Sequence, residues 1–330
     1  MSSVKQPHVL VVGGGSAGQR HIKNLVSLGA TGALVEPDES RHPPQKDSQA
    51  FIWSYKSLEA AIEAHKYSGA IVAVSTHLHA ECALPLLRLG LPVLIEKPLA
   101  HTTAAAELLR PYADQIRVGY SMRFQPAIQA IKAHLPEIGR ILYAHAEVGQ
   151  YLPQWHPGED YRQWYMAKRE QGGGAILDLS HELDYLQWLI APVSQANAFV
   201  GHVDETLEIT SDDLADIDGW LGPDIRFTCH MDLIDRHYNR RVRILGEKGT
   251  IDWDHNRGTV QVSGSAVTYG QDRNLQFVHE IGAFLEWMAG PEFNIPERMA
   301  TYEEAFHTLR VAETLRDQGQ LNWWPMTAWR

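Results

Sequence analysis

A glycine-rich turn near the N-terminus constrains the fold of this chain more than any other feature. Gly13, Gly15 and Gly18 stand in G-x-G-x-x-G spacing, directly after the apolar run Val9–Val12 and before the helical stretch Gln19–Leu25. Strand, glycine turn and helix in that order are the context that the dinucleotide fingerprint requires. The first glycine suits the tight turn, the second lets a pyrophosphate approach the backbone, and the third lets the helix pack close to the strand. We therefore favour a dinucleotide site over a plain glycine turn.

The helix after this turn and the next apolar run complete the pattern. Ser16 and Ala17 lie within the turn, and the N–H groups at the N-terminus of the following helix can bind phosphate. The run Ala33–Glu36 ends in Glu36, 36 − 18 = 18 positions after Gly18, close to the usual spacing of about 20 residues. A carboxylate there binds the ribose hydroxyls and repels a 2′-phosphate, which predicts NAD. A solvated carboxylate is the alternative, and nearby Arg41 keeps NADP open.

The size and charge of the chain limit its class. Its 330 residues suffice for two domains. The net charge of −11 argues against general affinity for nucleic acid or anionic membranes. The two cysteines, Cys82 and Cys229, show no metal-type spacing and no disulfide framework, which favours the cytoplasm. We see no signal peptide and no apolar run near the ~20 residues of a membrane span.

The first 120 residues alternate apolar runs with helical stretches. Such alternation is typical of a doubly wound parallel sheet with helices on both faces, which binds its ligand at the carboxyl ends of the strands. We therefore expect an α/β dinucleotide-binding domain over residues 1–120. The expected strands are Val9–Val12, Ala33–Glu36, Phe51–Tyr55, Ala70–Val74, Val93–Ile95 and Ile116–Gly119, and the expected helices include Ser57–Lys66, His79–Leu89 and Thr102–Tyr112.

In residues 121–330 the apolar residues recur with a different periodicity, and we expect an α+β domain with a largely antiparallel sheet. Ile225–Leu233 alternates apolar and polar residues, as a strand with one buried face does. Arg241–Leu245 and Thr250–Trp253 flank a four-residue loop and predict a hairpin. The polar face of this sheet is either solvated or an oligomer interface. Large aromatic residues slightly favour an interface, although core packing explains them nearly as well. These residues are Trp220, Trp253, Trp323 and Trp324. Helices are also expected in this domain, around Phe277–Met288 and Glu303–Leu315.

The first candidate for chemistry is a lysine that follows the run Val93–Ile95. Glu96-Lys97-Pro98 places Lys97 at the carboxyl end of a parallel strand, facing the ligand crevice. Its ammonium could stabilise negative charge that develops on a substrate oxygen, and Pro98 could follow a cis bond. A surface lysine paired with Glu96 is an equally good interpretation from position alone.

The second candidate follows the triple glycine Gly172–Gly174. Apolar residues from Ile176 to Ile190 recur at helical spacing. Asp178, His181, Glu182 and Tyr185 fall together on the opposite side of that helix. His181 suits a general base for a hydroxyl proton, oriented by Asp178 or Glu182. A solvated polar face is the alternative.

A pair of histidines, His77 and His79, could suggest metal ligands, but no third ligand stands at convincing spacing and we expect no metal. His79 opens a helix beside a strand end, so it either touches the cofactor or packs.

These segments together resemble the glucose–fructose oxidoreductase / inositol dehydrogenase family, also called Gfo/Idh/MocA. The similarity extends over nearly the whole chain, and the Glu-Lys-Pro element is specific. The resemblance implies a Rossmann domain, an open-faced antiparallel sheet that often forms dimers or tetramers, and NAD(P)-dependent hydride transfer at a carbinol carbon of a sugar, cyclitol or derivative. The motifs that carry it are Gly13–Leu25, Ser75–His79, Gly90–Ala100, Val118–Phe124, Ile138–Ile141, Gly172–Asp184 and Gly246–Ile251.

The resemblance also implies residue roles. Lys97 matches the family lysine that contacts substrate and His181 the catalytic histidine, with Asp178 in support. Asp178 and His181 are three apart where the family commonly has four, so either the histidine's role shifts or Glu182 takes its place. Cofactor contacts would come from the glycine turn with Ser16 and Ala17, from Glu36, Ser75, Thr76 and His79, and from Glu96 and Lys97. Ser75-Thr76 and Met122 depart from the usual Thr-Pro and asparagine.

Besides Glu182, four further residues are candidates for the substrate pocket. Aromatic rings suit a sugar face, and arginines suit a carboxylate or phosphate; the candidates are Arg123, Trp155, Tyr161 and Arg162. Two other functions stay open: a dinucleotide-binding sensor that turns nothing over, and a reductase of a non-sugar diol on the same fold.

Overall fold

The structure is a computed structural model that describes residues 6–42, 50–51, 53–269, 272–290 and 297–321. The chain forms two compact units: Met1–Ser121 with Asn274–Ala305, and Met122–Arg273 with Phe306–Arg330. The sequence-based division placed all of 121–330 in the second domain, whereas the first unit takes back the segment 274–305. This return could not be inferred from the change of rhythm near Tyr120.

The first unit is built on a seven-stranded sheet in the order β15-β6-β5-β4-β1-β2-β3. Every pair is parallel except the edge pair of β15 with β6, so the predicted doubly wound sheet is confirmed. The strands are β1 (His8–Val12), β2 (Thr31–Val35), β3 (Trp53–Tyr55), β4 (Gly69–Val72), β5 (Val93–Glu96), β6 (Ile116–Gly119) and β15 (Ala300–Thr301).

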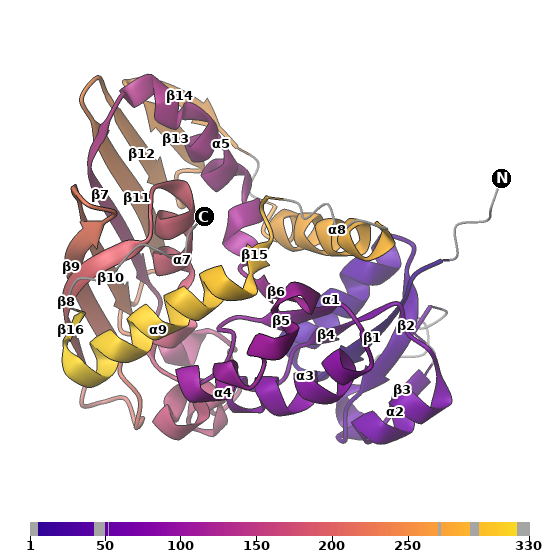
Figure 1. The fold of residues 1–330 in the computed structure, drawn as a ribbon. Coiled ribbons are helices and arrows are strands. Elements are labelled where there is room, and N and C mark those ends of the chain that lie inside the picture. The colour runs from indigo at the N-terminus through magenta and orange to yellow at the C-terminus, as the bar shows by residue number, and fades with distance from the viewer. Residues whose placement is uncertain (1–5, 43–49, 52, 270–271, 291–296, 322–330) are drawn as a thin grey trace. The chain divides into compact units, whose positions relative to one another are not determined.

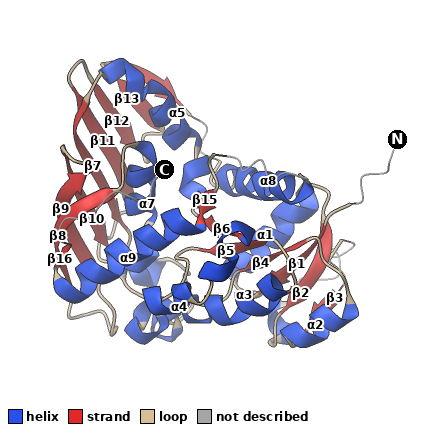
Figure 2. Cartoon of the chain, viewed as in Figure 1, coloured by secondary structure: helices blue, strands red, loops and turns tan. Residues whose placement is uncertain are grey.

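Helices cover both faces of this sheet (Figures 1 and 2). The helix α8, which the sequence placed in the other domain, packs against α1. The expected helix Thr102–Tyr112 is shorter, because a 3-10 helix with Pro111 in its first turn replaces the second half. The helices are α1 (Ser16–Ser27), α2 (Leu58–Ala64), α3 (His79–Arg88), α4 (Thr103–Glu107) and α8 (Leu275–Ala289).

The second unit contains a nine-stranded sheet in the order β14-β13-β12-β11-β7-β10-β9-β8-β16. It is antiparallel apart from the pair β10 and β7, and the predicted hairpin of β11 and β12 is present. The strands are β7 (Ile141–Gly149), β8 (Val193–Gly201), β9 (Leu214–Leu221), β10 (Ile225–Asp232), β11 (Asn239–Gly246), β12 (Thr250–Asp254), β13 (Thr259–Val262), β14 (Ser265–Thr268) and β16 (Gln320–Leu321).

One face of this sheet is buried beneath helices. The side chains of Ala144, Phe227 and Met231 are fully buried on it, and the helices α5 (Pro126–His134), α6 (Ala175–Asp178) and α7 (His181–Leu189) contact its strands. The long helix α9 (Tyr302–Gln318) runs from the first unit into the second.

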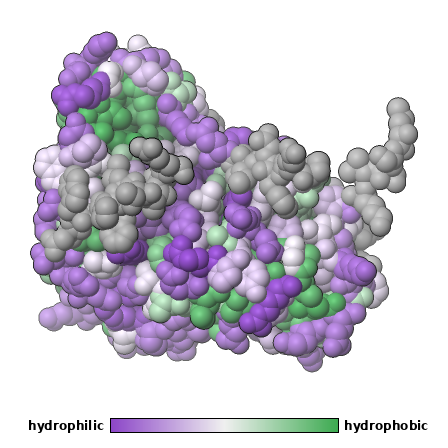
Figure 3. Space-filling view, viewed as in Figure 1, coloured by the Kyte–Doolittle hydropathy of each residue, from purple (hydrophilic) through white to green (hydrophobic). Residues whose placement is uncertain are grey.

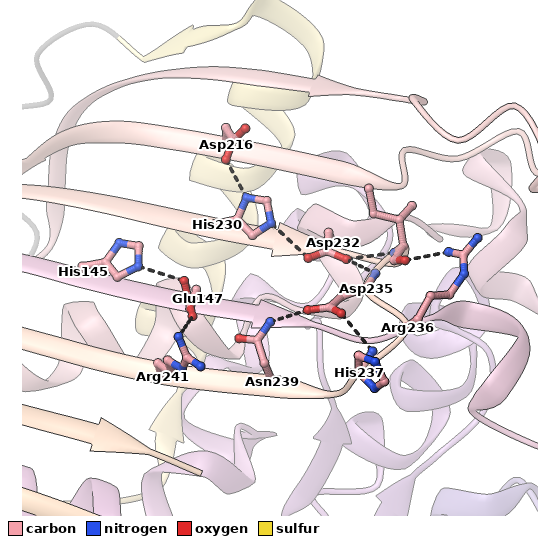
Figure 4. Close-up of polar contacts among 11 residues, drawn as sticks. His145, Glu147, Asp216, His230, Asp232, Asp235, Arg236, His237, Asn239 and Arg241 are labelled. Atoms are coloured by element: carbon pink, nitrogen blue, oxygen red, sulfur yellow. Dashed lines mark hydrogen bonds and ion pairs between the residues drawn. The ribbon is translucent and has the colours of Figure 1, made fainter. Parts of the chain in front are cut away.

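The other face carries charged side chains of alternating sign (Figure 4). His230 lies between Asp216 and Asp232, at 2.6 and 3.0 Å, and on the next strand Glu147 contacts Arg241. The hydrogen bond to Asp232, opposed by burial and aided by Asp216, raises the pKa of His230 to about 9.

The two described tryptophans of this sheet lie on opposite faces, because Trp220 shares the polar side of β9 with Asp216 and Asp218. Trp253 is in the core, and Trp220 stacks with Arg226 at 5.0 Å. The interface interpretation of Trp253 is therefore wrong, because its ring faces the buried side; Trp323 and Trp324 lie outside the described residues. Figure 3 shows mostly polar residues over the face that it presents, with apolar residues in separate areas.

Candidate active site

The glycine turn joins β1 to α1 as the fingerprint requires. Gly13 has φ +103°, and a Cβ on it would lie 2.4 Å from the Ala73 carbonyl oxygen. A Cβ on Gly18 would lie 1.9 Å from the Gly13 oxygen. Gly15 faces open space and, as the N-cap of α1, has no side chain to cap the first turn formed by Ser16 and Ala17. The turn therefore offers bare backbone and helical N–H groups to an anion such as a pyrophosphate.

Glu36 follows β2 and folds back onto this turn. Its Oε2 accepts the Gly14 N–H at 2.8 Å, and its Oε1 accepts the Asp38 N–H at 3.0 Å. The side chain is nearly buried rather than solvated, so the solvated-loop alternative is wrong. Arg41 is exposed and lies 3.5 Å from Asp38.

The loop after β4 holds Ser75, Thr76 and His79. Ser75 is half-buried and Thr76 is buried in a short 3-10 helix. The ring nitrogens of His79 lie 2.9 Å from the Pro98 carbonyl oxygen and 3.1 Å from that of Val74. Burial lowers the pKa of His79, although these two hydrogen bonds act to raise it. This histidine ties two loops together, which favours its packing role over contact with a cofactor.

The end of β5 carries the Glu-Lys-Pro element. The Lys97–Pro98 bond is cis, as predicted. The Glu96 carboxylate lies 2.7 Å from His21 Nε2 and 3.8 Å from Arg20, and it also accepts the Lys97 backbone N–H at 3.3 Å. Burial would raise the pKa of Glu96, but the hydrogen bond and charge of His21, with smaller effects from Arg20 and Lys97, lower it to about 2.

Strand register places the glycine turn and Lys97 at one edge of the sheet. Val12 of β1 is opposite Val72 of β4, and Val72 is opposite Ile95 of β5. The turn that begins at Gly13 and the segment Glu96–Lys97 therefore leave adjacent strands at the same carboxyl edge, where doubly wound sheets bind ligands.

In the second unit, the segment after Gly172–Gly174 forms two helices instead of one. Helix α6 ends at Asp178, and α7 begins at His181. Asp178, Glu182 and Tyr185 are buried, and His181 is half-buried. The solvated-face alternative is therefore wrong for the three buried residues, and the polar side chains have specific partners.

Those partners hold the residues on either side of His181. Asp178 accepts the Tyr165 hydroxyl at 2.8 Å and the Gly174 N–H at 3.2 Å. Glu182 lies 2.7 Å from Arg240 Nε. Burial raises the pKa of Glu182, and the Arg240 guanidinium opposes this rise.

The four substrate candidates have different surroundings. Arg123 is buried in a bidentate ion pair with Asp184, at 2.7 and 2.9 Å, which favours a structural role. Arg162 is exposed and pairs with Asp160 and Glu208. The Tyr161 hydroxyl accepts the Glu208 N–H, and the indole of Trp155 donates to the Gln150 carbonyl.

Sequence reasoning missed the partners of the predicted residues. His21, Tyr165 and Arg240 contact Glu96, Asp178 and Glu182 respectively, yet none belongs to a motif that marks such a role. Asp212 was missed as well; its carboxylate accepts the Ile176 N–H at the start of α6. In the described part of the chain, no three His, Cys, Asp or Glu side chains gather in a way that could hold a metal ion.

A glycine turn at the carboxyl edge of a parallel sheet, with an acid on the next strand, defines a dinucleotide-binding protein. Family models agree with this class. The model described as "Oxidoreductase family, NAD-binding Rossmann fold" matches residues 8–124, and the "GFO/IDH/MocA C-terminal domain" model matches residues 128–252. The chain belongs to this oxidoreductase family, and its first unit has the family's NAD-binding Rossmann fold.

Two individual relatives are similar to only part of this chain, at about 30% identity. A putative UDP-kanosamine synthase oxidoreductase subunit from Amycolatopsis mediterranei is 30% identical over 49% of this chain and 43% of its own length. An inositol 2-dehydrogenase from Corynebacterium glutamicum (strain R) is 29% identical over 56% of this chain and 54% of its own. The chain thus spans about half the length of these relatives.

Solved structures share the fold. A levoglucosan dehydrogenase in complex with NADH and levoglucosan superposes with a TM-score of 0.82, at 18% identity, over 96% of this chain and 97% of that one. A myo-inositol dehydrogenase from Corynebacterium glutamicum gives 0.79, at 17% identity, over 97% and 99%.

Proposed function

We propose that the protein is an NAD-dependent dehydrogenase or reductase that acts on a carbinol carbon of a sugar, cyclitol or sugar nucleotide. The observation that carries the proposal is the register of β1, β4 and β5, because it brings the glycine turn and Lys97 to one edge of the sheet. Membership of an oxidoreductase family supports a reaction at this edge. When bound, NAD accepts the hydride from the carbinol carbon or returns it there.

Lys97 is proposed to act on the substrate oxygen. Its ammonium donates a hydrogen bond to the oxygen and stabilises the negative charge that develops there as the proton leaves. The buried Pro98 and the contact of its carbonyl with His79 hold the backbone at this point. The residue thus projects from a fixed segment, which suits a group that must meet a reacting atom.

His181 is proposed to move the hydroxyl proton. An imidazole has a reference pKa near working pH, so it can accept the proton in oxidation and return it in reduction. Asp178 and Glu182, on either side of it, are both committed to buried contacts. We therefore assign the base role to His181 and positioning roles to these two carboxylates.

The substrate class follows from the relatives by analogy. They include an inositol 2-dehydrogenase, a levoglucosan dehydrogenase and a putative UDP-kanosamine synthase oxidoreductase subunit. Trp155 directly follows one short 3-10 helix, and Tyr161 and Arg162 lie on the next one along the chain. We propose these three residues as contacts for a polyhydroxylated ligand.

We further propose that the chain forms a homodimer or homotetramer through the polar face of the β7–β11 sheet, and that it works in the cytoplasm. Charges of both signs on that face support self-association. The free thiols Cys82 and Cys229 support a reducing compartment. None of the helices in the described part of the chain is long and apolar enough to cross a bilayer.

Replacing the lysine tests the function. The wild type is screened with NAD⁺ against levoglucosan, inositols and UDP-sugars, with NADH absorbance as the readout. Lys97→Ala should lower kcat about 100-fold or more, because one electrostatic donor is lost, while the Kd for NADH changes little. Lys56→Ala, an exposed lysine paired with Glu39 at 2.7 Å, is the matched control and should keep full activity.

Two outcomes would contradict the proposal. Turnover that survives Lys97→Ala would remove the lysine from the mechanism. NADH binding without turnover across the panel would favour the sensor function instead.

A further inference from the structure

A buried histidine on α1 contacts the carboxylate that directly precedes Lys97. The His21 side chain is fully buried, and its Nε2 lies 2.7 Å from Oε1 of Glu96, the last residue of β5. The two residues are 75 positions apart. Nδ1 of His21 is buried with no hydrogen-bond partner in the described part of the chain. Nε2 is therefore the ring nitrogen that donates its N–H to Glu96.

The Glu96 carboxylate is fixed on its other side as well. Oε2 accepts the Lys97 backbone N–H at 3.3 Å. Gly119 of β6 is directly opposite Glu96, and a Cβ there would lie 3.1 Å from Oε2. The glycine therefore leaves room for the carboxylate, and a larger residue at this position would crowd it.

Arg20 adds a positively charged group beside the same carboxylate. Its guanidinium lies 3.8 Å from Oε1 of Glu96 and stacks over the ring of Phe277 on α8, at 3.8 Å from the centroid. Two neighbouring residues of α1 thus hold one carboxylate of β5. An ionised carboxylate at a buried position needs such partners, because losing them leaves a buried charge without compensation.

This network connects two parts of the proposed site. Helix α1 begins at the glycine turn, and the carboxylate it holds belongs to the residue before Lys97. We propose that His21 and Glu96 are positioning residues that hold the Lys97 backbone at a fixed place relative to the glycine turn, so that the ammonium meets the substrate oxygen. Glu96 was expected to contact the cofactor; its commitment to His21 favours this positioning role. The inference rests on the proposed function.

The first test measures the backbone directly and needs no substrate. Amide hydrogen exchange at Lys97 is compared in wild type, His21→Leu and His21→Gln, without cofactor. In His21→Leu the amide should exchange about tenfold faster, because its acceptor is no longer held. In His21→Gln, whose amide can still donate from the position of Nε2, exchange should stay near the wild-type rate. Unchanged exchange in a folded His21→Leu variant would overturn the proposal.

A matched control separates positioning from general destabilisation. His307→Leu also removes a buried histidine, in the second unit and far along the chain from β5, so it should leave Lys97 exchange unchanged. If His21→Leu does not fold, His21→Leu with Glu96→Gln replaces it, because the neutral amide leaves no unpaired buried charge. Faster Lys97 exchange in that double variant supports the proposal, and wild-type exchange overturns it.

Kinetics then test the consequence for the reaction. His21→Leu should lower kcat about tenfold or more and leave the Kd for NADH within about threefold, and His21→Gln should restore most of kcat. Equal losses in both variants would overturn the proposal. If the wild type turns over no substrate, the proposed function fails, and the exchange result alone decides whether the pair positions Lys97.

Discussion

Three glutamates, Glu36, Glu96 and Glu182, come to lie in or near the interior, and each is held by a different kind of donor. Glu36 accepts backbone N–H groups, Glu96 accepts an imidazole N–H, and Glu182 faces a guanidinium. A carboxylate can be buried only when such partners replace water. The donors also differ in their position relative to a ligand. Among these three glutamates, only Glu36 accepts an N–H of the glycine turn, where a cofactor would bind.

Glu36 should therefore decide the cofactor. Replacing it by glutamine keeps the shape and removes the charge that repels a 2′-phosphate. In Glu36→Gln, the Kd for NADH should rise about tenfold, because charge-assisted hydrogen bonds to the ribose weaken. The Kd for NADPH should fall by a similar factor. Fluorescence titration with both cofactors measures the change.

Glu39→Gln is the control for this prediction. Glu39 lies three positions on, is 69% exposed and pairs with the surface residue Lys56 at 2.7 Å. Its replacement should leave both dissociation constants unchanged. A Glu36→Gln variant that still prefers NADH as strongly as the wild type would show that Glu36 does not select the cofactor.

The sequence predicted the residues of the site better than it predicted their partners. Gly13, Glu36 and Lys97 follow apolar runs at fixed offsets, so local pattern was enough to find them. His21 and Glu96 are 75 positions apart, and Glu182 and Arg240 are 58 apart. Nothing local marks such pairs, because they depend on which helix face meets which strand.

At the scale of elements, the strand–turn–helix at the N-terminus depends on backbone that only glycine allows. At φ +103°, a Cβ on Gly13 would be strained and would also meet the Ala73 carbonyl oxygen at 2.4 Å. Gly13→Ala should lower the free energy of unfolding of the first unit by about 2–4 kcal/mol. It should also weaken NADH binding, since the turn must shift.

Gly282→Ala is the matched control in the same unit. Gly282 lies inside α8, where a Cβ would meet nothing within 4 Å. Alanine should therefore stabilise the helix by about 0.5–1 kcal/mol. Urea unfolding of the two variants should give shifts of opposite sign. Equal shifts would mean that the conformation of the turn does not limit stability.

Element type was predictable where periodicity was strong, and the ends of elements were not. The alternation of Ile225–Leu233 gave β10 almost to the residue. The stripe from Ile176 to Ile190 predicted one helix, but the chain breaks at Leu179–Ser180 and starts again at His181. Both helices keep apolar side chains inward across the break, so periodicity alone could not detect it.

At the scale of the whole molecule, the division into two units could not be predicted from the periodicity of the sequence. The return of Asn274–Ala305 to the first unit adds β15 to the sheet edge and packs α8 on α1. The amphipathic stripe of α8 predicts a buried face, but it does not say which sheet buries it.

Buried histidines should set the acid limit of stability. Burial lowers the pKa of His307 to about 4, and it also lowers that of His79 and of His8. The unfolded chain, with His pKa near 6.5, then binds protons that the folded chain does not. Above pH 6.5 His307 is neutral in both the folded and the unfolded chain, and its effect on the free energy of unfolding is constant. Below pH 6.5 the unfolded chain is protonated first, which lowers the free energy of unfolding by about 2 kcal/mol at pH 5. Urea unfolding at pH 7.5, 6 and 5 measures this loss, which His307→Leu should reduce by about that amount.

His230 should act in the opposite direction at alkaline pH. With Asp216 and Asp232 as partners, its pKa is raised to about 9, so its contribution is complete below pH 6.5 and disappears as pH rises through 9. The side chain is one-third exposed, and solvent screening keeps the loss to about 1–2 kcal/mol. His230→Gln should flatten the stability profile between pH 7 and 9.5 and leave the acid side unchanged, whereas His307→Leu should do the reverse. If both variants alter the same side, the two histidines do not titrate in the environments described above.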